Sequence, residues 1–110
     1  VLRAADTFVF PSIKEGLGLA AIEAQASGLP VLMSEGVPAS ALMGGNAQRI
    51  ALEAGAEQWA HTCMQQLEIA LKSERHDGVD LVRSHGFDIA QTSAWLADFY
   101  KRAAQLAVRK

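Results

Sequence analysis

The ten residues EGLGLAAIEA, at positions 15–24, decide how this chain is interpreted. A hydrophobic run, a proline and a short polar segment precede them. An Ala-rich and almost uncharged segment begins at Leu19, and its composition predicts a helix. Two carboxylates stand eight positions apart, Glu15 before this helix and Glu23 inside it. A glutamate in so apolar a helix calls for a functional explanation.

Composition limits the class of protein. The 110 residues suffice for one domain, and a hydrophobic content of 50% with a net charge of -2 suits a globular core. This balance argues against a disordered chain and against a nucleic-acid partner. Cys63 is the sole cysteine, so an internal disulfide is excluded and a reducing cytoplasm is expected. The sequence has neither a signal peptide nor a run of ~18 apolar residues, so no membrane span is expected.

Alternating hydrophobic patterns predict an α/β fold. Strands are expected at residues 7–10, 31–34 and 49–52, with a helix over residues 19–27. Hydrophobic runs without polar alternation are typical of strands that are covered on both faces, as in parallel sheets. We therefore expect a partial Rossmann-like domain of about three parallel strands, with helices on both faces.

The second half of the chain is expected to be helical. A helical turn is predicted at residues 38–43, and helices at residues 56–72 and 79–84. Asp88 and Gln91 resemble a capping box for a long last helix. The apolar face of that helix carries Ile89, Leu96, Phe99, Tyr100, Ala103 and Leu106.

The start of the sequence suggests a piece of a longer protein. Residues 1–5 have the pattern of a helix end, there is no initiating Met, and three strands are few for such a sheet. We expect residues 1–110 to be a piece of a longer protein that begins inside a fold. An unpaired sheet edge or the last helix would then be available for self-association.

The loop before the first helix has the features of a phosphate site. In open α/β sheets, ligands bind outside the carboxyl ends of the strands, where residues 11–18 are expected. Free N–H groups at a helix start attract anions, and Gly16 and Gly18 allow a ligand to approach the backbone. Two glycines in such a loop are also common in ordinary turns. A loop carboxylate such as Glu15 can likewise be a solvated charge.

The two glutamates add information to this loop. Carboxylates repel phosphate, but they accept strong hydrogen bonds from hydroxyl groups. Glu23 lies roughly 6–8 Å along the helix from its start, at ~1.5 Å per residue. A nucleotide-sugar has hydroxyls on both sides of its diphosphate, with the ribose on one side and the hexose on the other, so it is the ligand that this pattern suggests. The alternative for Glu23 is an ordinary surface position, which fits poorly because residues 19–26 hold no other charge.

These residues resemble a known family. The segment from Asp6 to Ser12, the glutamates at positions 15 and 23, and the residues SGLPV at 27–31 are similar to the C-terminal domain of group 1 glycosyltransferases. These are retaining enzymes of the GT-B fold, and the glutamate pair matches their E-x7-E motif. The tail, with GFDI at 86–89, resembles members from exopolysaccharide or capsule synthesis.

The resemblance implies that residues 1–110 are the C-terminal part of a GT-B nucleotide-sugar-binding domain whose first strands are missing, and it implies specific roles. Glu15 would be the catalytic residue that binds hydroxyls of the donor hexose, and Glu23 would bind the ribose. Donor contacts would also come from Gly16, Leu17, Gly18 and Leu19, chiefly through backbone N–H groups. The donor would be a UDP- or GDP-sugar, with neither a cofactor nor a metal. A glycan or lipid-linked acceptor would bind to a missing N-terminal domain. The parent protein is expected in the cytoplasm, at the inner face of the membrane.

One departure limits the expectation. The phosphate-binding Arg and Lys of the family would precede Val1, and Arg3 and Lys14 do not match their positions. We therefore expect the isolated chain to be inactive. Two alternatives are a non-catalytic nucleotide-sugar-binding module and a structural, self-associating fragment. A glycoside hydrolase using both glutamates is a weaker alternative, because it needs the two carboxylates around an open cleft.

Other reactive side chains are expected to be structural. No two histidines have the spacing of metal ligands on one helix. We expect structural or solvent-exposed roles for His61, His76 and His85, and core filling for Cys63. Trp59 and Trp95 are expected to pack in the core or between elements.

Overall fold

A central parallel sheet organises the structure, a computed structural model that describes residues 1–108. Within these residues three strands lie in the order β1 (Phe8–Phe10), β2 (Val31–Ser34) and β3 (Ala47–Ile50). Both pairings are parallel. All four residues of the central strand β2 are buried, as its unbroken apolar run predicts. The expected fold class is confirmed.

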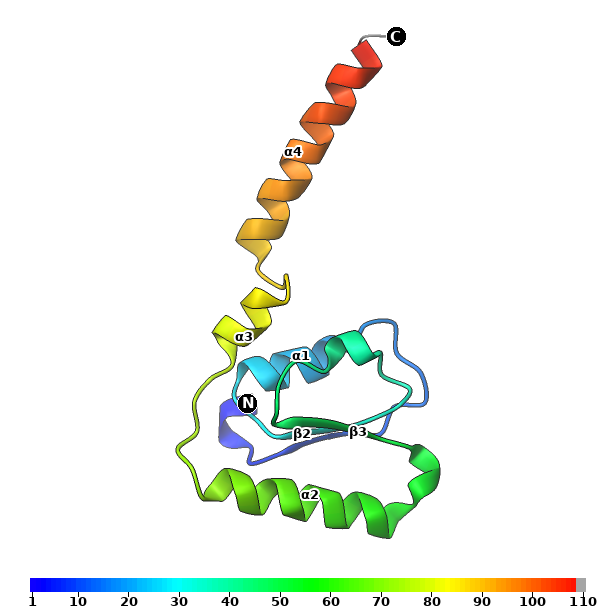
Figure 1. The fold of residues 1–110 in the computed structure, drawn as a ribbon, viewed down its shortest axis with the longest axis vertical. Coiled ribbons are helices and arrows are strands. Elements are labelled where there is room, and N and C mark those ends of the chain that lie inside the picture. The colour runs from blue at the N-terminus through cyan, green and yellow to red at the C-terminus, as the bar shows by residue number, and fades with distance from the viewer. Residues whose placement is uncertain (109–110) are drawn as a thin grey trace.

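Two helices cover opposite faces of this sheet. Figure 1 shows α1 (Leu19–Ala26) on one face and α2 (Ala56–Leu71) on the other. The short helix α3 (Val79–Ser84) packs beside α1. Three 3-10 turns complete this part of the described chain, namely η1 (Leu2–Ala4), η2 (Ala39–Ala41) and η3 (Leu52–Ala54). The main core lies between α1 and the sheet and includes the fully buried Val31, Met33 and Val37.

Two side chains hold the elements of the domain together. Gln25, which is 6% exposed, donates from Nε2 to the carbonyls of Ala21 and Ala41 and accepts from the N–H of Met43. It therefore joins α1 to the segment that contains η2. The guanidinium of Arg75 donates to carbonyls in residues 2–5 and at position 27. This arginine attaches the loop after α2 to η1 and to the end of α1.

The last helix stands apart from the compact domain. In Figure 1, α4 (Ile89–Val108) extends away from the sheet, and the molecule is 62 Å long. No residue of α4 is buried, and Trp95 is 64% exposed. Asp88 caps the helix by accepting from the N–H of Ala90, whereas no bond back from Gln91 is among those of the described residues. None of the helices within residues 1–108 is both long and apolar enough to cross a membrane.

Three expectations need correction. The third strand is Ala47–Ile50, two residues earlier than expected, because pairing with β2 sets its register. On α2 the buried side chains are the polar Thr62 and Gln66, and the predicted apolar stripe is only half-buried or exposed. Gln66 donates to the carbonyl of Val31 in the sheet below it. Trp95 joins no core and stacks on Phe99 of its own helix, with ring centroids 5.6 Å apart.

Candidate functional site

The loop of residues 11–18 leaves β1 at the carboxyl edge of the sheet and leads into α1. Gly18 is the N-cap of α1, and no side chain caps the helix start. The N–H groups of Leu17, Gly18, Leu19 and Ala20 have no hydrogen-bond partner within residues 1–108. Free N–H groups and the positive end of the helix dipole form an anion-binding position.

Gly18 is required by its backbone conformation and its surroundings. Its φ is 83°, in the left-handed region that residues with a Cβ rarely adopt. A Cβ at this position would lie 2.7 Å from Cγ1 of Val37, whose side chain is fully buried. The glycine therefore lets the start of α1 approach the segment that follows β2. Gly16 has open space instead, with nothing within 4 Å of such a Cβ.

Glu15 is half-buried and fixed at both its backbone and its side chain. Its N–H donates to the carbonyl of Gly36 at 2.9 Å, so the loop is attached to the segment after β2. Its Oε1 accepts a hydrogen bond of 2.9 Å from the hydroxyl of Ser12. Among the described residues Oε2 has no such partner, and it is the oxygen that remains for a ligand.

Glu23 lies in different surroundings. It is exposed on α1, one turn beyond the helix start, and lines an apolar groove of about 510 Å³. Leu19 and Ala26 line the same groove, so the three residues share a face of α1, as their spacing predicts. Glu15 is absent from this lining. The structure thus places the two glutamates on either side of the helix start, in separate surroundings.

The structure adds residues that the sequence argument did not identify. Ser12 contacts Glu15, and the spacing S-x-x-E is a signal that could have indicated this contact. The fully buried Ser34 donates to the carbonyl of Ser12, which no local pattern indicates. Arg49 lies near the carboxyl end of β3, and its Nη2 donates to the carbonyl of Glu35 at 2.9 Å. The register of the sheet brings it there.

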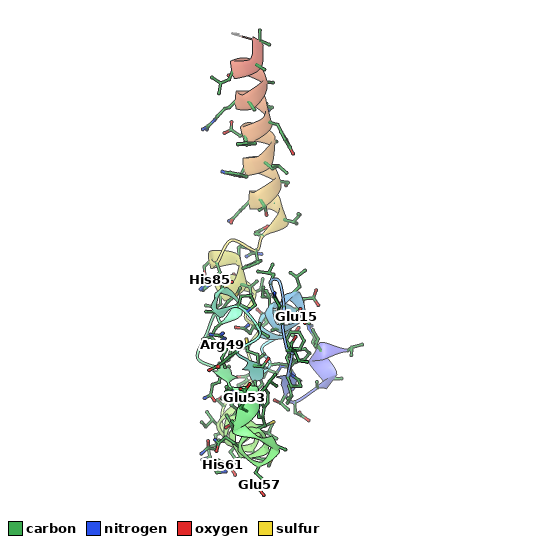
Figure 2. The ribbon with its side chains drawn as sticks, turned by 90° about the vertical axis from the view of Figure 1, so that its right-hand side faces the viewer. Glu15, Arg49, Glu53, Glu57, His61 and His85 are labelled. Carbon is green, nitrogen blue, oxygen red and sulfur yellow. The ribbon has the colours of Figure 1, made fainter. Side chains whose placement is uncertain are left out.

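The other candidate side chains are far apart. His85 is the C-cap residue of α3, and Figure 2 shows His61 and Glu57 on α2, well away from Glu15. Cys63 is half-buried on α2, 3.9 Å from the hydroxyl of Thr7. The indole of Trp59 donates to the carbonyl of Ala51, which confirms a packing role. Across residues 1–108, no group of three or more His, Cys, Asp or Glu side chains is placed to hold a metal ion.

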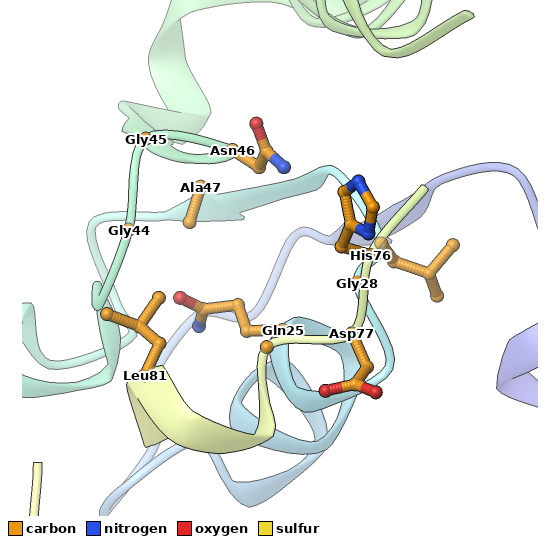
Figure 3. Close-up of a pocket in the computed structure, with 11 residues that line it drawn as sticks. Gln25, Gly28, Gly44, Gly45, Asn46, Ala47, His76, Asp77 and Leu81 are labelled. Atoms are coloured by element: carbon orange, nitrogen blue, oxygen red, sulfur yellow. The ribbon is translucent and has the colours of Figure 1, made fainter. Parts of the chain in front are cut away.

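A second hollow lies at the opposite edge of the sheet. It measures about 310 Å³ and is lined by the end of α1, residues 44–47 before β3, and residues 76–78 (Figure 3). Gln25 lines this pocket, but it donates to two backbone carbonyls and so has no free donor for a ligand. None of residues 11–18 is among the residues that line this pocket, so it is separate from that loop.

Comparison with known proteins identifies the class. The family model of group 1 glycosyl transferases matches residues 1–77. The chain belongs to this family. It is 32% identical over 101 residues to the provisionally named glycosyltransferase EpsF of Bacillus subtilis (strain 168). It is also 53% identical over 34 residues to the UDP-Gal:alpha-D-GlcNAc-diphosphoundecaprenol alpha-1,3-galactosyltransferase of Escherichia coli.

The coverage of these relatives is partial. The EpsF match includes 91% of this chain but 26% of EpsF, and the galactosyltransferase match includes 31% of this chain and 9% of that enzyme. The chain thus spans about a quarter of the longer-matching relative. No solved structure gives a significant match.

Proposed function

We propose that this chain is the donor-binding part of a retaining hexosyltransferase that uses a nucleotide-sugar, a UDP- or GDP-sugar. The observation that carries the proposal is the uncapped start of α1 at the carboxyl edge of a parallel sheet. Its free N–H groups suit the diphosphate of such a donor. Membership of the group 1 glycosyl transferases supports the same chemistry.

The two glutamates would contact the donor on either side of its diphosphate. The free Oε2 of Glu15 would accept from hydroxyls of the hexose, next to the bond that breaks. Glu23, one helical turn further on, would accept from the ribose hydroxyls. Charge-assisted hydrogen bonds of this kind orient a sugar strongly. The backbone from Gly16 to Leu19 would contact the sugar and the diphosphate.

Catalysis would be electrostatic. As the bond from the sugar to the diphosphate breaks, negative charge develops on the leaving phosphate. The N–H groups at the start of α1 would stabilise that charge, and preorganised donors of this kind contribute strongly to rate enhancement. Neither a metal nor a cofactor has a part in this proposal. The acceptor, a glycan or a lipid-linked sugar in surface-polysaccharide synthesis, would bind to a separate domain at the inner face of the membrane.

Calorimetric titration tests donor binding. UDP, GDP and ADP and their sugars are titrated into the chain, with Glu23→Ala and Glu57→Ala as a matched pair. Both are exposed glutamates on helices, and Glu57 lies on α2 at the other face of the sheet. We expect Glu23→Ala to weaken nucleotide binding about 10-fold or more, since it removes a charge-assisted bond. Glu57→Ala should have no effect.

Two results would contradict the proposal. One is the absence of binding by the unaltered chain for every nucleotide and nucleotide-sugar. The other is equal nucleotide affinity in the Glu23→Ala and Glu57→Ala variants, which would disprove the assignment of Glu23 to the ribose hydroxyls. With an acceptor added, we expect the chain alone to transfer no sugar, so measurable transfer would disprove the need for a separate acceptor domain.

A further inference from the structure

A short chain of hydrogen bonds leads from the interior of the sheet to Glu15. The hydroxyl of Ser34, at the end of β2, donates to the carbonyl of Ser12. The hydroxyl of Ser12 in turn donates to Oε1 of Glu15 at 2.9 Å. Ser34 is fully buried, whereas Ser12 and Glu15 are half-buried. The loop is thus attached to the central strand of the sheet, which is buried along its whole length.

The backbone around this chain allows little movement. Glu15 donates from its N–H to Gly36, and a Cβ on Gly36 would lie 2.3 Å from the carbonyl oxygen of Ile13. The two loops therefore touch along their backbones, and only glycine fits at the contact. The loop position of Glu15 is fixed by neighbours from the segment after β2.

The Ser12 hydroxyl has one proton and two acceptors within reach. The carbonyl of Lys14 is 3.4 Å away and the Glu15 carboxylate is 2.9 Å away. The shorter bond to a charged acceptor is the stronger one, so the proton lies toward Glu15. This bond occupies Oε1 and leaves Oε2 without a hydrogen-bond partner among the described residues.

We propose that Ser12, itself fixed by Ser34, is a positioning residue that holds the Glu15 carboxylate ready for the hexose of the donor. This inference rests on the proposed function, in which Glu15 binds hexose hydroxyls. A glutamate side chain that is already ordered loses less freedom when the sugar binds. Removal of the serine hydroxyl should weaken hexose binding by roughly 3- to 10-fold, the cost of ordering one such side chain.

The test separates the hexose from the nucleotide. For the tightest of UDP-galactose, UDP-glucose and GDP-mannose, the ratio of its Kd to that of its own nucleoside diphosphate is measured by calorimetry. Ser12→Ala should change this ratio by roughly 3- to 10-fold against the sugar and leave nucleoside diphosphate binding unchanged. Ser12→Thr, which keeps the hydroxyl, should restore the ratio. Ser40→Ala, an exposed serine on η2, is the matched control.

A merely structural role for Ser12 would weaken sugar and nucleotide binding together, and this result would overturn the inference. An unchanged ratio in Ser12→Ala would also overturn it. If Ser12→Ala does not fold, Ser12→Cys replaces it, and its weaker donor should give an intermediate ratio. Glu15→Ala identifies which proposal fails. If it removes the hexose preference while Ser12→Ala keeps it, only the positioning role is wrong, whereas no effect in either variant rejects both proposals.

Discussion

Gly18→Ala is the substitution that tests the site architecture most directly. Gly18 has a φ of 83°, and a Cβ there would lie 2.7 Å from Val37 and 3.6 Å from Ala41. A left-handed backbone costs a residue with a Cβ about 1–2 kcal/mol. Forcing an extra methyl group against a packed side chain costs about 1–3 kcal/mol more. The lower entropy of the unfolded chain returns ~0.4–1 kcal/mol.

The expected loss in the free energy of unfolding is therefore about 1–4.5 kcal/mol. For a domain of this size that corresponds to a fall in Tm of roughly 4 °C or more. Gly16→Ala is the matched control, since it lies in the same loop with nothing within 4 Å of the added Cβ. It should leave the stability unchanged or raise it by ~0.4–1 kcal/mol, again through the unfolded chain.

Urea unfolding followed by helical circular dichroism at 222 nm measures both variants. A second substitution isolates the steric part of the effect. The double variant Gly18→Ala with Val37→Ala removes the overlap between the new Cβ and the Val37 side chain but keeps the backbone strain. Its loss in the free energy of unfolding should therefore be smaller than the sum of the losses of the two single variants. Equal midpoints for the Gly16 and Gly18 variants would refute the reasoning. So would strictly additive losses, because they would mean that the two side chains do not meet.

Three other perturbations follow from packing and hydrogen bonding. Gln25→Leu should lower the free energy of unfolding by about 2–4 kcal/mol, because buried backbone groups lose their hydrogen-bond partner. A loss below ~0.5 kcal/mol, measured by urea unfolding, would contradict the structural role of Gln25. Arg75→Gln should lower the free energy of unfolding by about 1–2 kcal/mol and expose residues 1–5 to proteolysis, because it removes hydrogen bonds to their carbonyls. The control Arg83→Gln loses ion pairs to the exposed Asp80 and the half-buried Asp88, and should cost under ~1 kcal/mol. Leu32 is fully buried, so Leu32→Ala should lower the free energy of unfolding by about 2–5 kcal/mol. Trp95 is 64% exposed, so Trp95→Ala should lower it by under ~0.5 kcal/mol. Equal urea midpoints for the two variants would show that α4 packs on the domain.

The sequence determined most of the local structure. The strand at residues 31–34 and the helix at residues 79–84 occur where the apolar patterns predict them, and the other strands and the helix at α1 differ by one or two residues. These features depend on nearest neighbours along the chain, because side-chain periodicity and helix-ending residues act over one or two turns. The same local information indicates the loop and helix start that would bind a phosphate.

Tertiary packing decided features that no local pattern contains. The exact register of β3 depends on its pairing with β2. The exposure of Trp95 depends on whether another surface of the protein packs against α4. An amphipathic face predicts that a helix can be buried, not which surface buries it. The polar buried side of α2 has the same origin, since the buried Gln66 donates from Nε2 to a carbonyl of β2 that only the folded sheet brings beneath the helix.

The candidate site also combines features set by the sequence with features set by the tertiary structure. The sequence by itself determined the residue types, namely two glutamates, two glycines and an uncapped helix start between them. Only the tertiary structure decided how they are held, because Ser34 at the end of β2 and Gly36 just after it contact loop residues more than twenty positions earlier in the chain. Contacts across that separation form only when the parallel sheet aligns the carboxyl ends of β1 and β2. That alignment fixes Glu15 beside the start of α1.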